Sequence, residues 1–196
     1  MIYSKEIWGP KAWNLLHAFS MNDSLKINNK KKHQYYIFYT SFIYILPCEI
    51  CSKHYEEIIY YINPFIEKNI TREYLIKWVF DAHNTVNSLL DKKEYLYNDF
   101  IKNHKTNNND IYFILYYIYN NLDYDKISLF KYDNIYNFFI NFCILYPNKN
   151  IKNNLKKLIN SDDFKKIITP KDFKLWFKNN VLNIKNIIFY NNLLNN

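Results

Sequence analysis

Hydrophobic and polar positions alternate along most of the chain with the period of an α-helix. Near the start, four residues share one helical face at spacings i, i+3, i+4 and i+7: Trp13, Leu16, His17 and Ser20. Pro10 suits the first turn of that helix, because a residue there needs no backbone N–H. We therefore expect an amphipathic helix that begins near Pro10.

Three further helices follow the same pattern. The second is expected over residues 32–46 and must end at Pro47, because proline disfavours helical backbone in the residue before it. The third begins at the pair Cys48 and Cys51 and extends to about residue 62. Thr71 is predicted to cap the fourth, with Glu73 in its first turn. This helix carries His83, Asn87 and Leu90 on one stripe, beside a more apolar face.

Residues 103–110 are polar and charged, and they mark the most plausible boundary. Beyond them, aromatic helical segments alternate with turns rich in Asn and Lys, and Thr169 is predicted to cap a helix that starts at Pro170. The single glycine argues against sheets with tight turns and against glycine-rich phosphate loops. We predict an all-α protein with one helical domain over residues 1–107 and a second helical region over residues 108–196.

Composition and charge narrow the range of functions. Hydrophobic residues make up 49% of the 196 residues, which is ample for a core. The formal net charge is +8, but the lysines are scattered and Arg72 is the only arginine. Specific base recognition usually depends on arginine, so binding to nucleic acid is not expected.

The cellular context is predicted from what the sequence lacks. No apolar stretch is long enough to span a bilayer, and the first residues lack the apolar centre of a signal peptide. Three cysteines do not make a secreted disulfide scaffold. We therefore expect a cytoplasmic, non-secreted protein without a membrane segment, in which a close cysteine pair is catalytic or binds a metal.

Cys48 and Cys51 form a C-x-x-C motif at the start of a helix. Unpaired N–H groups and the positive end of the helix dipole favour the thiolate there. Two intervening residues place both sulfurs on one side of the first turn, where they can form an exchangeable disulfide. His54 lies on the same face and can tune the proton balance.

The cysteine pair alone leaves three interpretations open. Cys48, Cys51, His54 and a distant histidine such as His83 would make a Cys2His2 zinc set. Thioredoxin-like chemistry would need a βαβ setting, which this helical pattern does not provide. Two buried structural thiols are the third interpretation.

Three motifs in order set the pair in a wider context. They are W-G-x-x-x-W-x-x-L-H at 8–17, P-C-x-x-C-x-x-H-[FY] at 47–55 and H-N-x-V-N-x-x-L-x-K at 83–92, the last with Leu90 at its leucine position. Together they resemble the Erv/ALR family of FAD-linked sulfhydryl oxidases, and the resemblance covers roughly the first hundred residues. It implies a four-helix bundle with a short fifth helix that binds FAD, followed here by the additional C-terminal helical region.

The resemblance also assigns site residues. Cys48 and Cys51 match the redox-active pair. The positions that match flavin or nucleotide contacts are Trp8, Lys11, Trp13, His17, His54, His83, Asn84, Val86, Asn87, Lys92 and Tyr95. No metal site is implied. Lys92, near the end of its helix, offers a point charge for a diphosphate.

The sequence departs from the family pattern in three places. Many relatives carry a structural disulfide at positions that are Phe80 and approximately Tyr97 here, so aromatic packing is expected to replace it. A shuttle cysteine pair is missing, and Cys143 lies among aromatic residues at helical spacing, which predicts a buried thiol. An arginine that relatives often place after the third motif is also missing, with Lys102 and Lys105 nearby.

The resemblance implies an enzyme that forms disulfides in protein substrates. Electrons pass through the Cys48–Cys51 disulfide to FAD and then to oxygen, which gives hydrogen peroxide. The implied partners are a protein dithiol, such as a thioredoxin-like carrier, and a second copy in a homodimer. Viral members work in the host cytoplasm or virion, and we expect the same here. The alternative is a non-enzymatic Cys2His2 zinc module with a basic helical tail.

Overall fold

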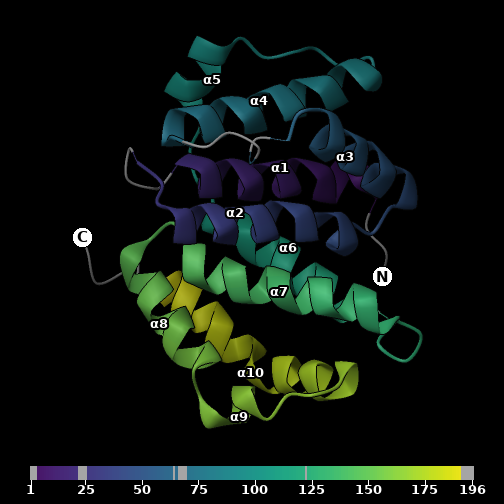
Figure 1. Ribbon diagram of the computed structural model, residues 1–196, viewed down its shortest axis with the longest axis vertical. Coiled ribbons are helices and arrows are strands. Elements are labelled where there is room, and N and C mark those ends of the chain that lie inside the picture. The colour runs from purple at the N-terminus through teal and green to yellow at the C-terminus, as the bar shows by residue number, and fades with distance from the viewer. Residues whose placement is uncertain (1–3, 22–25, 64, 66–69, 122, 191–196) are drawn as a thin grey trace.

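The computed structural model describes residues 4–21, 26–63, 65, 70–121 and 123–190 (Figure 1). Within these residues the chain forms ten α-helices and one 3₁₀ helix, and the β-pairing is limited to a single bridge between Lys26 and Thr71. The prediction of an all-α protein is confirmed. None of the described helices is both long and apolar enough to cross a membrane.

The first half of the chain forms the predicted four-helix bundle with a short fifth helix. Its elements are α1 (Lys5–Met21), α2 (Asn29–Ser41), the 3₁₀ helix η1 (Phe42–Ile45), α3 (Glu49–Tyr61), α4 (Arg72–Leu89) and the short α5 (Tyr97–Asn103). In Figure 1, α4 and α2 lie on opposite sides of α1, and α3 lies at one end. Buried Tyr35 and Tyr39 of α2 donate hydrogen bonds to the carbonyls of Phe19 and Leu16 in α1.

Two helix starts differ from the predictions. The first helix begins at Lys5 rather than near Pro10, so the proline lies inside it. A proline there leaves the carbonyl four residues earlier without its helical partner. Burial of Trp8, which is 7% exposed, contributes free energy that offsets this loss. The second helix begins at Asn29, three residues early, because the Asn28 side chain caps it by accepting from the N–H of Lys31.

The predicted threonine caps are confirmed. The Thr71 side chain accepts from the N–H of Tyr74 at the start of α4. Thr169 Oγ1 accepts from the N–H of Asp172 at the start of α10 (Pro170–Tyr190). Each cap satisfies one of the N–H groups that a helix start leaves unpaired.

The second half packs against the bundle rather than apart from it. It contains α6 (Asn108–Asn121), α7 (Leu129–Leu145), α8 (Lys149–Ile159), the short α9 (Asp162–Lys165) and α10. Helix α6 contacts α1, and α7 contacts α2. The ring of Phe19 stacks on Phe142 and the ring of Phe38 stacks on Phe138, at centroid distances of 5.3 and 5.1 Å. One hydrophobic core therefore runs through both halves, and the division at residue 107 stays a prediction.

Cys143 lies in that core. It is fully buried in α7, and burial raises the pKa of its thiol well above the ordinary value. A thiol that resists ionisation is a poor nucleophile. The prediction of a buried thiol at Cys143 is confirmed.

Candidate active site

A cavity of about 680 Å³ lies among α1, α3, α4 and α5. Its volume is in the range of small-molecule and cofactor pockets. The predicted site residues that line it are Trp8, Trp13, His17, Cys48, Cys51, His54, His83, Val86, Asn87, Lys92 and Tyr95. The three motifs, which are far apart in sequence, therefore meet around one space.

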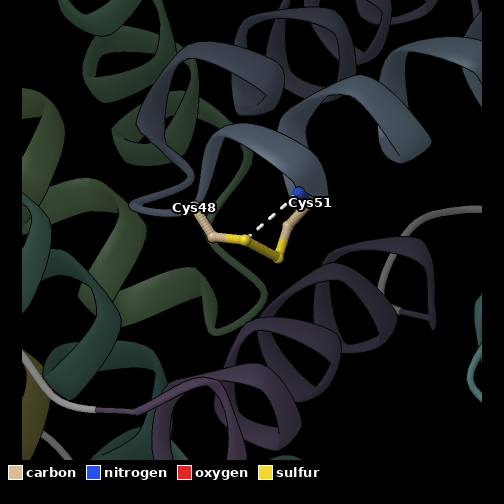
Figure 2. Close-up of a disulfide and its surroundings, with 2 residues drawn as sticks. All are labelled: Cys48 and Cys51. Atoms are coloured by element: carbon tan, nitrogen blue, oxygen red, sulfur yellow. Dashed lines mark hydrogen bonds between the residues drawn. A yellow bond between two sulfur atoms is a disulfide. The ribbon is translucent and has the colours of Figure 1, made fainter.

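The cysteine pair forms one wall of the cavity. Cys48 and Cys51 are joined by a disulfide, with their Cα atoms 5.1 Å apart. Cys48 is the N-cap of α3, and its Sγ accepts a hydrogen bond from the N–H of Cys51 at 3.2 Å (Figure 2). Both cysteines are partly buried and line the cavity. When the disulfide is reduced, this N–H and the positive end of α3 stabilise negative charge on Cys48.

A stack of flat side chains from α1 and α4 faces the same space. The indole of Trp13 stacks on the imidazole of His83, with centroids 4.3 Å apart and planes 9° from parallel. His17 Nε2 and His83 Nδ1 are 3.0 Å apart, so one of these rings donates a hydrogen bond to the other. Phe100 of α5 closes the cluster, with its centroid 4.4 Å from that of His17. Aromatic walls of this kind suit a flat ring system.

Burial keeps these histidines neutral. Loss of solvent, with smaller contributions from the neighbouring charges of His104 and Lys92, lowers the pKa of His83 to about 4. The pKa of His17 is lowered well below its usual value, first by burial and then by His83 and His104. Burial also lowers the pKa of His104. All three rings are therefore uncharged at neutral pH and can act as hydrogen-bonding groups without a net charge.

The loop after α4 is fixed by a residue of the third motif. The Asn84 side chain makes two hydrogen bonds with the backbone of Tyr95, donating to its carbonyl and accepting from its N–H, at 2.9 and 3.0 Å. Asn84 is not among the residues that line the cavity, and its contact with the cofactor stays a prediction. Its amide holds Tyr95 beside the cavity.

Lys11 also lies outside the lining, and its contact with the flavin stays a prediction. It sits on the face of α1 that meets α6, where its ammonium pairs with Asp110 at 2.6 Å and lies over the ring of Phe113. Asp110 also accepts from the Asn14 side chain. The negative charge of Asp110 on α6 thus directs Lys11 away from the cavity. The ion pair also joins the C-terminal region to α1.

The structure adds cavity residues that the motifs did not identify. Phe100, Asn103 and His104 line the cavity from α5 and the residue after it. Phe100 and His104 are four residues apart, so they share a helical face. That spacing is the signal in the sequence, but a single pair at i, i+4 is too common to identify a site. Lys105, which lies near the position of the missing arginine, also lines the cavity.

The cavity fits a large polar ligand with flat rings. Four polar atoms of lining residues are buried without a hydrogen-bond partner: Asn14 Oδ1, His17 Nδ1, Tyr55 Oη and His104 Nε2. Buried polar atoms without partners are rare in folded proteins, and a bound ligand can satisfy them. The aromatic stack, these polar atoms and Lys92 at the rim match the ring, amide and phosphate groups of FAD.

The zinc alternative finds no support in the site. The two sulfurs that would bind the metal are bonded to each other. Among the described residues, no three His, Cys, Asp or Glu side chains are grouped so that they could hold a metal ion.

Comparison with known proteins agrees with this site. The model of the Erv1 / Alr family matches residues 10–106, which include both cysteines and the third motif. A probable FAD-linked sulfhydryl oxidase of Acanthamoeba polyphaga mimivirus is 33% identical over 99 residues, which cover 50% of this chain and 69% of the relative. The chain belongs to the Erv1/Alr family.

Other relatives in the family cover the same segment. The FAD-linked sulfhydryl oxidase of African swine fever virus (isolate Pig/Kenya) is 36% identical over 86 residues, 44% of this chain and 70% of the relative. The mitochondrial FAD-linked sulfhydryl oxidase of Saccharomyces cerevisiae is 32% identical over 87 residues, 44% of each chain. The crystal structure of the yeast Erv1 core aligns with a TM-score of 0.49 at 30% identity, covering 54% of this chain and 87% of that one. Helices α6 to α10 lie outside the segment that the Erv1/Alr family model matches.

Proposed function

We propose that this chain is an FAD-dependent thiol oxidase that forms disulfide bonds in protein substrates. The observation that carries the proposal is the Cys48–Cys51 disulfide in the wall of the cavity that the Trp13, His17 and His83 stack also lines. Family membership and the printed names of the relatives support the same activity.

The cysteine chemistry follows from the position of the pair. A substrate thiolate attacks Cys48 Sγ, which forms a mixed disulfide and releases the Cys51 thiolate. A second substrate thiolate then attacks the substrate sulfur of that mixed disulfide and releases Cys48 as a thiolate. The N–H of Cys51 and the start of α3 stabilise this leaving group. The substrate loses two electrons and two protons, and the enzyme pair gains the electrons.

The residues that would hold FAD are those of the aromatic stack together with Asn87, Lys92 and Tyr95. When bound, the cofactor supplies the two-electron oxidation that restores the Cys48–Cys51 disulfide and the transfer of those electrons to oxygen, which yields hydrogen peroxide. His17 and His83 stay neutral and offer donors or acceptors without a charge. Lys92 provides the positive charge for a diphosphate.

The proposal extends to partners and location. The substrate is a protein dithiol, such as a thioredoxin-like carrier, because Cys143 is buried and cannot relay electrons from the surface. The host cytoplasm or a virion is the proposed location, supported by the viral relatives. A homodimer is also proposed; it must use surfaces other than the faces of α1 and α2 that α6 and α7 cover.

Oxygen consumption with a model dithiol tests the function. The purified chain should be yellow, should consume oxygen with dithiothreitol and should release hydrogen peroxide. Cys51→Ala should lower the rate at least a hundredfold while the flavin stays bound, because no sulfur remains to pass electrons on. Cys143→Ala, at a buried cysteine away from the cavity, is the matched control and should keep nearly the full rate. A colourless protein that contains zinc, or a Cys51→Ala variant with normal activity, would refute the proposal.

A further inference from the structure

The outward face of α3 begins at the disulfide and carries large exposed side chains. Ile50 lies between the two cysteines and is 66% exposed. Glu57 and Tyr61 lie on the same stripe of the helix as Ile50, at spacings i+7 and i+11. Tyr60 and Tyr61 are each 78% exposed, and their rings meet edge-to-face. We call Ile50, Glu57, Tyr60 and Tyr61 the α3 stripe.

The α3 stripe is not needed for the packing of α3 in the bundle. The opposite face of the helix carries the buried residues Tyr55, Ile58 and Ile59, and α3 contacts η1 and α4. The stripe therefore leaves isoleucine and tyrosine rings in water. Aromatic residues are enriched where proteins contact one another, because they offer a large apolar area together with a polar group.

The charge of α3 is opposite to that of the whole chain. The helix carries Glu49, Glu56 and Glu57 against a single lysine, Lys53, whereas the formal net charge of the chain is +8. Lys53 pairs with Glu49 at 3.0 Å. Glu56 and Glu57 are exposed, and neither forms an ion pair with a residue that the structure describes. Negative charge thus lies beside the apolar side chains of the α3 stripe.

The α3 stripe falls within the area that a protein substrate must cover. Ile50 also lines the cofactor cavity, so the stripe is continuous with the site of the disulfide. From Ile50 to Tyr61 the stripe extends about 16 Å along the helix. A standard protein–protein contact covers about 800 Å² on each partner, or roughly 30 Å across. A substrate segment of about five extended residues spans the length of the stripe.

We propose that the α3 stripe, with Glu56 beside it, binds the segment that flanks the cysteine pair of the protein substrate and selects apolar and basic residues in it. This inference rests on the proposed thiol oxidase function. Apolar side chains of the segment pack on Ile50 and Tyr61. A lysine or arginine of the segment pairs with the exposed carboxylates and lies over a tyrosine ring.

Steady-state kinetics of the full chain with its FAD test the proposal. The probes are two synthetic peptides, each with a C-x-x-C pair and a leucine, and with either lysine or glutamate about five residues from the cysteines. The lysine peptide should have a KM about fivefold lower than the glutamate peptide at low ionic strength, with similar kcat. The difference should shrink in about 0.5 M salt, because salt screens exposed charges.

Substitutions on α3 locate the effect. Glu57→Lys should reverse the preference between the peptides, because it repels lysine and attracts glutamate. Asp163→Lys is the matched control: it makes the same change of charge at an exposed acid of α9, which lies far from α3 in Figure 1, and should keep the preference. Tyr61→Ser should raise the KM of both peptides about fivefold. Leu175→Ser, at a leucine of α10 that is 60% exposed, should not.

Dithiothreitol separates failure of this proposal from failure of the oxidase proposal. It is too small to reach Tyr61 from Cys48, so all four variants should oxidise it at the wild-type rate. A wild-type chain that does not oxidise it would refute the oxidase proposal. Peptides with serine in place of cysteine, followed by NMR titration, then test the surface without turnover and should show the same preference and reversal.

Two outcomes would overturn the inference while the oxidase proposal stands. One is an equal KM for the two peptides, or a preference that Glu57→Lys leaves unchanged. The other is a dimer in solution that Tyr61→Ser dissociates, which would assign the α3 stripe to a second copy of the chain.

Discussion

At the scale of single residues, His83 shows how the cavity sets the charge state of its lining. The ring is stacked on Trp13 and within hydrogen-bonding distance of His17, and loss of water disfavours its charged form. The pKa of His83 is about 4 in the folded chain, compared with 6.5 for an ordinary histidine. The folded state therefore binds a proton less readily than the unfolded state does.

This difference predicts a dependence of stability on pH. Above pH 6.5 both states are neutral at His83, and its effect on stability is constant. As the pH falls from 6.5 towards 4, the unfolded chain takes up the proton first, so the free energy of unfolding decreases. Between pH 7 and pH 5 the loss from His83 should be about 2 kcal/mol. His17, whose pKa is lowered by the same cause, acts in the same direction.

Urea unfolding of wild type and His83→Gln at pH 7 and pH 5 measures this contribution. The variant loses stability at both pH values, but its loss between them should be smaller than that of wild type by about 2 kcal/mol. Other titrating groups are common to both proteins and cancel in the difference. Equal pH dependence in the two proteins would mean that His83 titrates normally in the folded state.

At the scale of secondary-structure elements, ring contacts join α4 to α5. Phe80 is buried in α4 and meets the ring of Tyr97 edge-to-face at a centroid distance of 5.1 Å. Phe80 also contacts Phe100, and the Lys77 ammonium lies over the rings of Phe80 and Tyr97. The expected aromatic packing between Phe80 and Tyr97 is confirmed. This packing holds α5 against the cavity.

Phe80→Ala should therefore loosen α5. Truncation of a buried phenylalanine costs about 3 kcal/mol or more, and here it also removes the contacts that position Phe100. We expect lower flavin retention and faster hydrogen exchange in Tyr97–Asn103, measured by mass spectrometry. Tyr97→Phe is the control, because it keeps the ring and should change both quantities little. Unchanged exchange in α5 after Phe80→Ala would show that other contacts hold this helix.

The sequence predicted the elements better than it predicted individual contacts. Thr71 and Thr169 have a local cap chemistry that can be read without tertiary information. Lys11 and Asn84 fit the motif positions, yet the structure turns them to Asp110 and Tyr95. These partners are 99 and 11 residues away, and neither pairing follows from periodicity.

The residues that line the cavity also show that tertiary contacts are harder to predict from sequence than helices are. The motifs located the residues on α1, α3 and α4, because most of each motif lies on one helix, where its spacing fixes a face. His104 follows the end of α5, and its place beside His17 depends on how the loop after α4 returns. That path is fixed by the Asn84–Tyr95 hydrogen bonds and by ring packing, which are tertiary contacts.

At the scale of the whole molecule, the C-terminal half contributes to the core of the bundle. Phe138 and Phe142 of α7 are fully buried against Phe38 and Phe19. The Lys11–Asp110 ion pair joins α1 to α6 at the other contact. The bundle surface that α7 covers is apolar, so it depends on the second half for burial.

A chain that ends at Asn107 tests how far the two halves depend on each other. Its exposed apolar faces should lower the melting temperature by more than 10 °C and promote association, because several fully buried rings lose their partners. Scanning calorimetry and light scattering measure these effects, with the full chain as the control. A monomeric fragment with the flavin content and melting temperature of the full chain would show that residues 1–107 fold independently.

The ring contact between Phe80 and Tyr97 has a consequence for working conditions. A covalent bridge at this place could be cleaved by the reductants on which such an enzyme acts, whereas van der Waals contact between two rings is indifferent to them. The disulfide in the described chain closes a span of only three residues at the start of one helix, so its opening in each turnover releases little of the fold. Opening and closing of the Cys48–Cys51 disulfide therefore does not disturb the helical fold. The fold should stay intact in a strongly reducing medium.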